Sequence, residues 1–350
     1  MNSNREIEWI NFAKFIAIVA VIFDHSYGVL YFNERVRILS YFSVSLFVLI
    51  SGMLSYRSII KHQLSWFKTF WRSSKRIILA YLVSTMVYYV WVNRFFDLYQ
   101  YIQLISNFNI SGPFYYVALY IQLMLISKPL FNIIDKIPMT KKGIIIEVIF
   151  GFLLLYISHC SIFYSNILYL YGGAGKLLGG TYLFLYYLGM ICSKHDVFSV
   201  DKDTKINLIT IIFGLLLILW IGYVYNKQFF IEESFVELFG EGKNPPGVTI
   251  IVMAVLVLFF VYGLYNFLRR VHIFVPFMKG TNYIGKHTLY IFLYHRFFLD
   301  YIFPSYLAIN GLWIKRLIYI VGMILAPICV EYMFKGICLL FKEKDFKIEE

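Results

Sequence analysis

Charged residues are scarce in this chain. Asp, Glu, Lys and Arg make up 15% of its 350 residues, whereas soluble domains carry about 25%. Hydrophobic residues reach 60%, above the range of about 45–50% that is typical of soluble proteins. A soluble core cannot bury so much apolar surface, so the composition excludes an ordinary soluble enzyme. We predict an integral membrane protein.

The sequence also lacks any polar stretch long enough to form a separate soluble domain. Apolar runs follow one another almost from end to end, which predicts a single transmembrane domain over residues 1–350 with no appended soluble domain. The polar start MNSNREIEW is short, and the apolar run after it has no small-residue cleavage site. We therefore expect a retained helix and no cleaved signal peptide.

Cysteine is rare, and its spacing matches neither a metal site nor a disulfide framework. The four residues Cys160, Cys192, Cys329 and Cys338 are scattered through apolar runs. They are most simply packing residues, and we expect no metal centre.

The apolar runs predict an all-α bundle of about ten transmembrane helices, because about 20 apolar residues span the hydrocarbon core. The predicted spans are 9–31, 38–56, 77–96, 113–134, 143–163, 178–193, 206–226, 248–268, 283–303 and 313–334. No inverted repeat of the kind found in many secondary transporters is visible, which is weak evidence against a transporter.

The formal net charge of +12 is explained by topology. Residues 57–76 carry six Lys or Arg and no acid, while residues 227–243 carry four Glu and two Lys. The positive-inside rule therefore places 57–76 in the cytoplasm, together with both termini. The basic excess faces anionic lipid headgroups, and nucleic acid is not an expected partner.

The first span concentrates the ionisable residues, in WINFAKFIAIVAVIFDHSYG. Such groups are costly in hydrocarbon and are functional candidates by default. Lys14 and His25 are eleven residues apart, so they share one helix face about 16 Å apart along the axis. An anionic ligand head held by Lys14 could place a reactive end near His25, which suits a general base.

These residues also have structural interpretations. Lys14 could extend its ammonium group to the membrane surface, and His25 could be a packing residue. Asp24 points about 100° away from His25 on the helix, so it cannot be assumed to orient that imidazole. It could pair with another helix instead.

From Lys14 through His25 the chain resembles the membrane acyltransferase-3 family, whose first helix carries a basic residue, ten further residues and a histidine. The likeness continues in SLFVLISG, in KRIILAY, in GPFYYVALYIQL, in YLFLYYLGM, in NPPG and in YIGKHTLYIFLYH. Single motifs are weak, but their order and spacing cover nearly the whole chain.

The resemblance implies about ten spans and transfer of an acyl group, usually acetyl, from cytoplasmic acyl-CoA to a sugar hydroxyl near the outer face. Acetyl-CoA is then the donor, and a glycan or lipid-linked sugar is the acceptor. The CoA phosphates are expected at the basic inner surface, where the candidate residues are Lys14, Arg57, Arg72, Lys75 and Arg76. His25 is expected either to deprotonate the acceptor or to carry the acyl group itself.

His295 matches a histidine that the family often has in the ninth span, where it could bind acceptor or assist proton transfer; the alternative is a core histidine bonded to a neighbouring helix. We guess that the adjacent Arg296 pairs with Glu331, and Glu147 has no evident role. Ser51 and Gly52 fit close helix packing better than a nucleophile.

The chain departs from the family pattern in three ways. Lys14 stands where the family most often has Arg, which replaces a planar bidentate group by a point charge. Ala80 stands where many members have Pro. The hydrolase-like domain that many relatives append is not seen in this sequence.

The predicted function is an integral membrane O-acyltransferase that acetylates a bacterial surface polysaccharide or its lipid-linked precursor in the cell membrane. The alternatives are a polysaccharide exporter or flippase of the same architecture, in which His25 is replaceable, and an assembly protein that tolerates changes at both Lys14 and His25.

Overall fold

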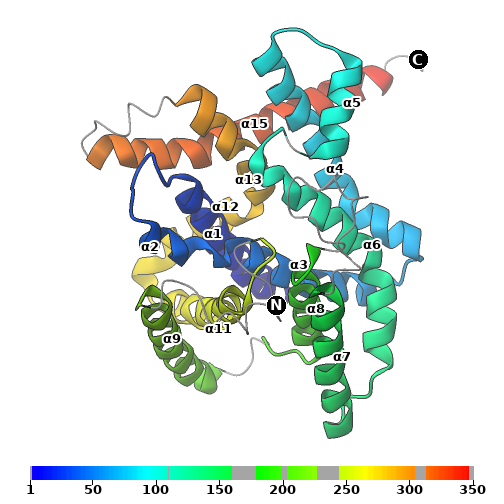
Figure 1. Cartoon of the computed structure of the whole chain (residues 1–350), viewed down its shortest axis with the longest axis vertical. Helices are drawn as coiled ribbons and strands as arrows, with labels where there is room; N and C mark the ends of the chain where they lie inside the picture. Colours follow the sequence, from blue (N-terminus) through cyan, green and yellow to red (C-terminus); the bar gives the residue numbers. More distant parts are fainter. Residues whose placement is uncertain are drawn as a thin grey trace.

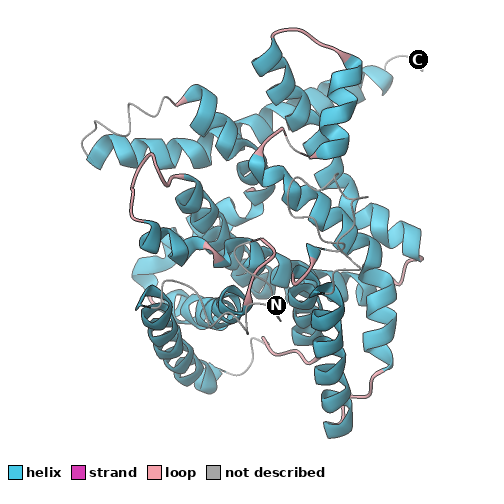
Figure 2. Cartoon of the chain, viewed as in Figure 1, coloured by secondary structure: helices cyan, strands magenta, loops and turns pink. Residues whose placement is uncertain are grey.

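The computed structural model describes residues 2–108, 110–159, 179–198, 203–226, 244–303 and 313–346. Within these ranges the regular structure is entirely helical (Figure 2). This confirms the all-α fold class.

Ten helices or helix groups coincide with the predicted spans. They are α1 (Asn2–His25), α3 (Phe42–His62), α4 (Trp66–Asn93), α6 (Tyr115–Lys136), α7 (Lys141–His159), α8 (Tyr182–Lys194), α9 (Asp203–Asn226), α11 (Val248–Arg270), α12 (Val275–Lys286) with α13 (Thr288–Phe297), and α15 (Trp313–Phe346). Short segments connect them: α2 (Glu34–Arg37), η1 (Ile38–Ser40), α5 (Leu98–Asn107), η2 (Gly112–Phe114), η6 (His272–Phe274) and the π-helical turn η7 (Phe298–Ile302).

The centre of the bundle is built around α1 and α3 (Figure 1). α3 packs against α1, α6, α8 and α11, and α1 also contacts α12 and α13. α9 lies outside α11, and α15 packs on α13. The two central helices therefore place their side chains at the junction of most of the other elements.

Glycines allow α3 and α8 to approach closely. A Cβ atom on Gly52 would lie 2.1 Å from the carbonyl oxygen of Tyr186, and one on Gly189 would lie 2.1 Å from that of Leu49. Small residues at membrane helix interfaces permit this kind of backbone contact. Gly52 is thus a close-approach residue, as its sequence context predicts.

Five of the described helices are long and apolar enough to cross a membrane: those within Ile38–His62, Trp66–Asn93, Gly112–Lys136, Val248–Arg270 and Trp313–Gly336. Large apolar side chains face outward on other helices too, for example Ile149, which is 61% exposed on α7. Such an outer surface suits contact with lipid. The chain is therefore a membrane protein, and the number of about ten spans stays a prediction.

The predicted basic connector 57–76 is mostly helical. α3 continues to His62 and α4 begins at Trp66, with the turn made by Gln63 in the left-handed region at φ 44°. Lys, Arg and Ser are compatible with helix, so the loss of hydrophobicity ends the apolar span without ending the helix.

A proline in α6 helps to fix this turn. Pro129 has no N–H, so it leaves the carbonyl of Leu125 without its usual helical partner. The indole Nε1 of Trp66, at the start of α4, donates to that carbonyl at 2.7 Å. The hydrogen bond connects the α3–α4 turn to α6.

The first and the ninth predicted spans also differ from expectation. The first was predicted to reach residue 31, but α1 ends at His25, and Gly28 follows in a turn with φ 82°. The ninth was predicted as one helix over 283–303, but the helix is interrupted at His287, between α12 and α13. The parts of the fifth and sixth predicted spans at 160–163 and 178 lie outside the described residues.

The α3–α8 contact makes a specific prediction for Gly52→Ala. The added methyl group overlaps the backbone of Tyr186, and we expect a loss of about 1–3 kcal/mol, which is typical of overpacking. Thermal unfolding of the purified protein in detergent measures this as a lower midpoint. Gly222→Ala in α9 is the matched control, because its Cβ meets no atom within 4 Å. Equal midpoints for the two variants would contradict the close contact.

Candidate functional site

The two candidate histidines meet in the folded chain. His25 is the last residue of α1, and His295 lies in α13, which packs against α1. Their ring centroids are 5.1 Å apart, with an angle of 40° between the ring planes. Residues separated by 270 positions in sequence therefore form one imidazole pair.

The hydrogen bonds of His295 fix its tautomer. Its Nδ1 lies 2.8 Å from the carbonyl oxygen of Phe292 and 3.1 Å from that of Ile291. Carbonyl oxygens only accept, so Nδ1 carries the proton, and in the neutral ring Nε2 is an acceptor. This Nε2 is buried and has no hydrogen-bond partner among the described residues. An acceptor nitrogen is thus available beside His25.

An ion pair with a buried acid and a partly exposed cation links the residue before His25 to the short helix after the turn. Asp24 is 3% exposed, and its Oδ1 accepts a hydrogen bond from Nε of Arg37 at 2.9 Å. The Arg37 guanidinium also lies 4.8 Å from the ring centroid of Tyr27. The partner of Asp24, which the sequence left open, is therefore in the short helix α2 that follows the turn.

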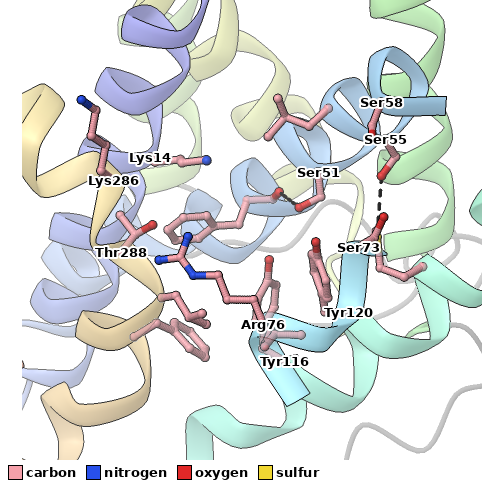
Figure 3. A pocket seen from close by; sticks show the side chains of 16 residues that line it. Lys14, Ser51, Ser55, Ser58, Ser73, Arg76, Tyr116, Tyr120, Lys286 and Thr288 are labelled. Atoms are coloured by element: carbon pink, nitrogen blue, oxygen red, sulfur yellow. Dashed lines mark hydrogen bonds between the residues drawn. The ribbon is translucent and has the colours of Figure 1, made fainter. Parts of the chain in front are cut away.

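A cavity of about 320 Å³ lies between α1, α3, α4, α6, α12 and α13. Three cations line it, namely Lys14, Arg76 and Lys286. Hydroxyl groups make up much of the remaining polar lining, from Ser51, Ser55, Ser58, Ser73, Tyr116, Tyr120 and Thr288. Figure 3 shows the cations and Thr288 on one side and the serines and tyrosines on the other. The site combines positive charge with many hydrogen-bonding groups.

One aromatic ring of the cavity lining lies beside the histidine pair. Phe292 lines the cavity, and its ring lies 5.0 Å from that of Tyr116 and 6.0 Å from that of His295. Lys14, another lining residue, is on the same helix as His25, about 16 Å away along the axis. The first helix therefore contributes both a cation of the cavity and one imidazole of the pair.

The five predicted phosphate-binding residues separate into two groups. Lys14 and Arg76 line the cavity, whereas Arg57, Arg72 and Lys75 do not. Arg57 lies 4.0 Å from a carboxylate oxygen of Asp196, Nη2 of Arg72 lies 2.9 Å from Nε2 of His62, and Lys75 is exposed. Their part in binding phosphates stays a prediction.

Lys286 is the cavity cation that sequence reasoning missed. It is the last residue of α12 and lies inside the predicted ninth span, in the motif YIGKHTLYIFLYH. The rule that an ionisable residue within an apolar span is a functional candidate was sufficient to select it.

The guessed pair of Arg296 with Glu331 is wrong. Nε of Arg296 lies 3.0 Å from Oδ2 of Asp300, one helical turn further along. Glu331 is fully buried and is bound by His287, Lys335 and Arg76 instead. The acid of the tenth span is therefore connected to the cavity and not to the region around Arg296.

Glu147 also has partners, in a cluster away from this cavity. Its carboxylate oxygens lie 2.7 Å from Nζ of Lys194 and 2.6 Å from Nε2 of His195. Lys194 also donates to the carbonyl of Ile134 at 2.8 Å, near the end of α6. The cluster joins the ends of α6, α7 and α8, which accounts for Glu147 as a structural residue.

Ser51 lines the cavity with its hydroxyl bonded within its own helix. Its Oγ donates to the carbonyl oxygen of Phe47 at 2.8 Å. Serines in membrane helices commonly make this bond. This bond agrees with the interpretation of Ser51 as a packing residue.

Comparison with known protein families matches residues 7–332 to a family described as an acyltransferase domain, the acyltransferase-3 family. No curated protein and no solved structure matches the chain. The matched range contains both histidines and every residue that lines the cavity. The chain belongs to the acyltransferase-3 family, and it is a membrane-bound O-acyltransferase.

Proposed function

We propose that this acyltransferase takes acetyl from cytoplasmic acetyl-CoA and transfers it to a hydroxyl group of a bacterial surface polysaccharide or its lipid-linked precursor. The observation that carries this proposal is the basic cavity whose lining residue Phe292 lies beside the histidine pair. In the predicted topology, Arg76 belongs to the basic connector on the cytoplasmic side of the plasma membrane.

The cations of the cavity suit the phosphates of the donor. Lys14, Arg76 and Lys286 come from three different helices and converge on one space. Charged hydrogen bonds between such groups and phosphate oxygens are short and strong. The many hydroxyl groups on the opposite wall suit the amides and hydroxyls of the pantetheine arm, which then extends toward Phe292.

The chemistry requires a base at the acyl end. His25 accepts the proton of the acceptor hydroxyl while the oxygen attacks the thioester carbonyl. The C–S bond breaks, and CoA leaves as a thiol with the proton that His25 releases, so the reaction balances without another reactant. His295 accepts a hydrogen bond from protonated His25 through its available Nε2. An acyl group carried briefly on His25 is the two-step alternative.

Replacing His25 by Ala removes the base, and we expect the rate of acetyl transfer to fall by a factor of about 10²–10⁴. Surface glycan from cells with native protein and from cells with His25→Ala is compared at matched protein level, and ester-linked acetyl is read by NMR. His272→Ala, an exposed histidine in η6, is the control. Unchanged acetyl overturns the catalytic role, and loss of the glycan itself from the surface indicates export.

The two histidines are expected to act as one unit. Groups that act together give strongly non-additive effects. We therefore expect His295→Gln to slow acetylation and the double variant with His25→Ala to be no slower than His25→Ala alone. The initial rate of ester-acetyl accumulation after induction is the measurement. If the rate of the double variant falls by the product of the two single-variant factors, the two residues act independently.

Lys14→Ala should weaken CoA binding by about tenfold or more, because a hydrogen bond to a charged group contributes about 1.5–3 kcal/mol. Isothermal titration calorimetry of the purified protein in detergent with CoA measures Kd directly. Lys68→Ala is the control, since Lys68 is an exposed lysine of α4 that does not line the cavity. Equal losses for both lysines show a general charge effect and contradict a specific phosphate site.

A further inference from the structure

Glu331 is a fully buried carboxylate with three basic partners. Its Oε2 accepts a hydrogen bond from Nδ1 of His287 at 2.7 Å. Its Oε1 lies 2.7 Å from Nζ of Lys335 and 3.3 Å from Nη2 of Arg76. A buried charge is tolerated only when it is paired in this way. The cluster joins α15 to α4 and to the break between α12 and α13.

Two of these contacts lead directly to the cavity. Arg76 is one of its three lining cations. His287 separates Lys286 from Thr288, and both of these residues line the cavity as well. Glu331 therefore contacts one lining residue directly and holds the imidazole that stands between two others in sequence.

The position of His287 makes this contact important. The residue is the C-cap of α12 and the N-cap of α13, with φ −102°. Where a helix is interrupted in this way, no continuous series of helical hydrogen bonds fixes the angle between the two segments, here α12 and α13. The bond from Nδ1 to Glu331 supplies a fixed point, and rings of Tyr283 and Tyr332 lie 4.7 Å and 5.5 Å from the imidazole.

The charges of the cluster leave the cavity positive. Lys335 is the closer cation to Oε1 and balances the carboxylate from outside the cavity lining. The longer contact with Arg76 orients the guanidinium without cancelling its charge. A bidentate group of this kind needs a fixed direction to bind a phosphate well.

We propose that Glu331 is a positioning residue for the acyl-CoA donor, which holds Arg76 and the Lys286–Thr288 segment in the arrangement that binds the donor phosphates. This inference rests on the proposed function, because it assumes that the cavity binds CoA. Glu331 itself does not line the cavity, so its effect is transmitted through its partners.

The test measures CoA binding to the purified full chain in detergent, together with thermal unfolding. We expect Glu331→Gln to raise Kd for CoA by about tenfold. Glu147→Gln is the matched control, because it removes the charge of another buried carboxylate with two basic partners away from the cavity. It should alter the unfolding midpoint and leave Kd within about twofold of the native value.

A double-mutant cycle separates positioning from general stability. Once Arg76 is replaced by Ala, the further change Glu331→Gln should weaken CoA binding much less than it does in the native chain. Glu331→Asp retains the charge on a shorter side chain and is the substitute if Glu331→Gln does not fold. Its Kd for CoA is expected to lie between the native value and that expected for Glu331→Gln. Undiminished affinity in the folded Glu331 variants overturns the inference, as does an equal loss in Glu147→Gln. Absence of CoA binding by the native chain overturns the proposed function and this inference together.

Discussion

Ionisable side chains inside an apolar bundle need partners, and this constraint organises the polar interior of the protein. Asp24, Glu147 and Glu331 are each almost fully buried, and each is paired with a cation or histidine from another element. Desolvation makes an unpaired charge at such a position too costly to keep. The acids therefore act as joints between helices, and Glu331 also contacts Arg76, one of the three cations that line the cavity.

The helical architecture could be predicted because its signal is local. A run of about 20 apolar residues is long enough to cross the membrane regardless of what surrounds it. The helix ends could not be predicted in the same way, because hydrophobicity and helicity stop at different residues. Arg57 and Arg76 belong to helices that continue beyond the apolar run. The break at His287 falls in the polar run Gly285–Thr288, which contains no proline to mark it.

The candidate site could be predicted where it depends on one helix. The rise per residue fixes the separation of Lys14 and His25 from sequence alone. The proximity of His295 to His25 depends on how α13 packs against α1, and no local pattern encodes that packing. The partner of Arg296 was a different case, since Asp300 is one turn away and the spacing of four residues was readable in the sequence.

The phenyl ring of Phe292 has a second consequence. It separates the basic cavity from an imidazole that can bind and release protons. A membrane protein must also preserve the electrical insulation of the bilayer in which it lies. Phe292 is thus placed to keep the contents of the cavity away from the buried imidazole.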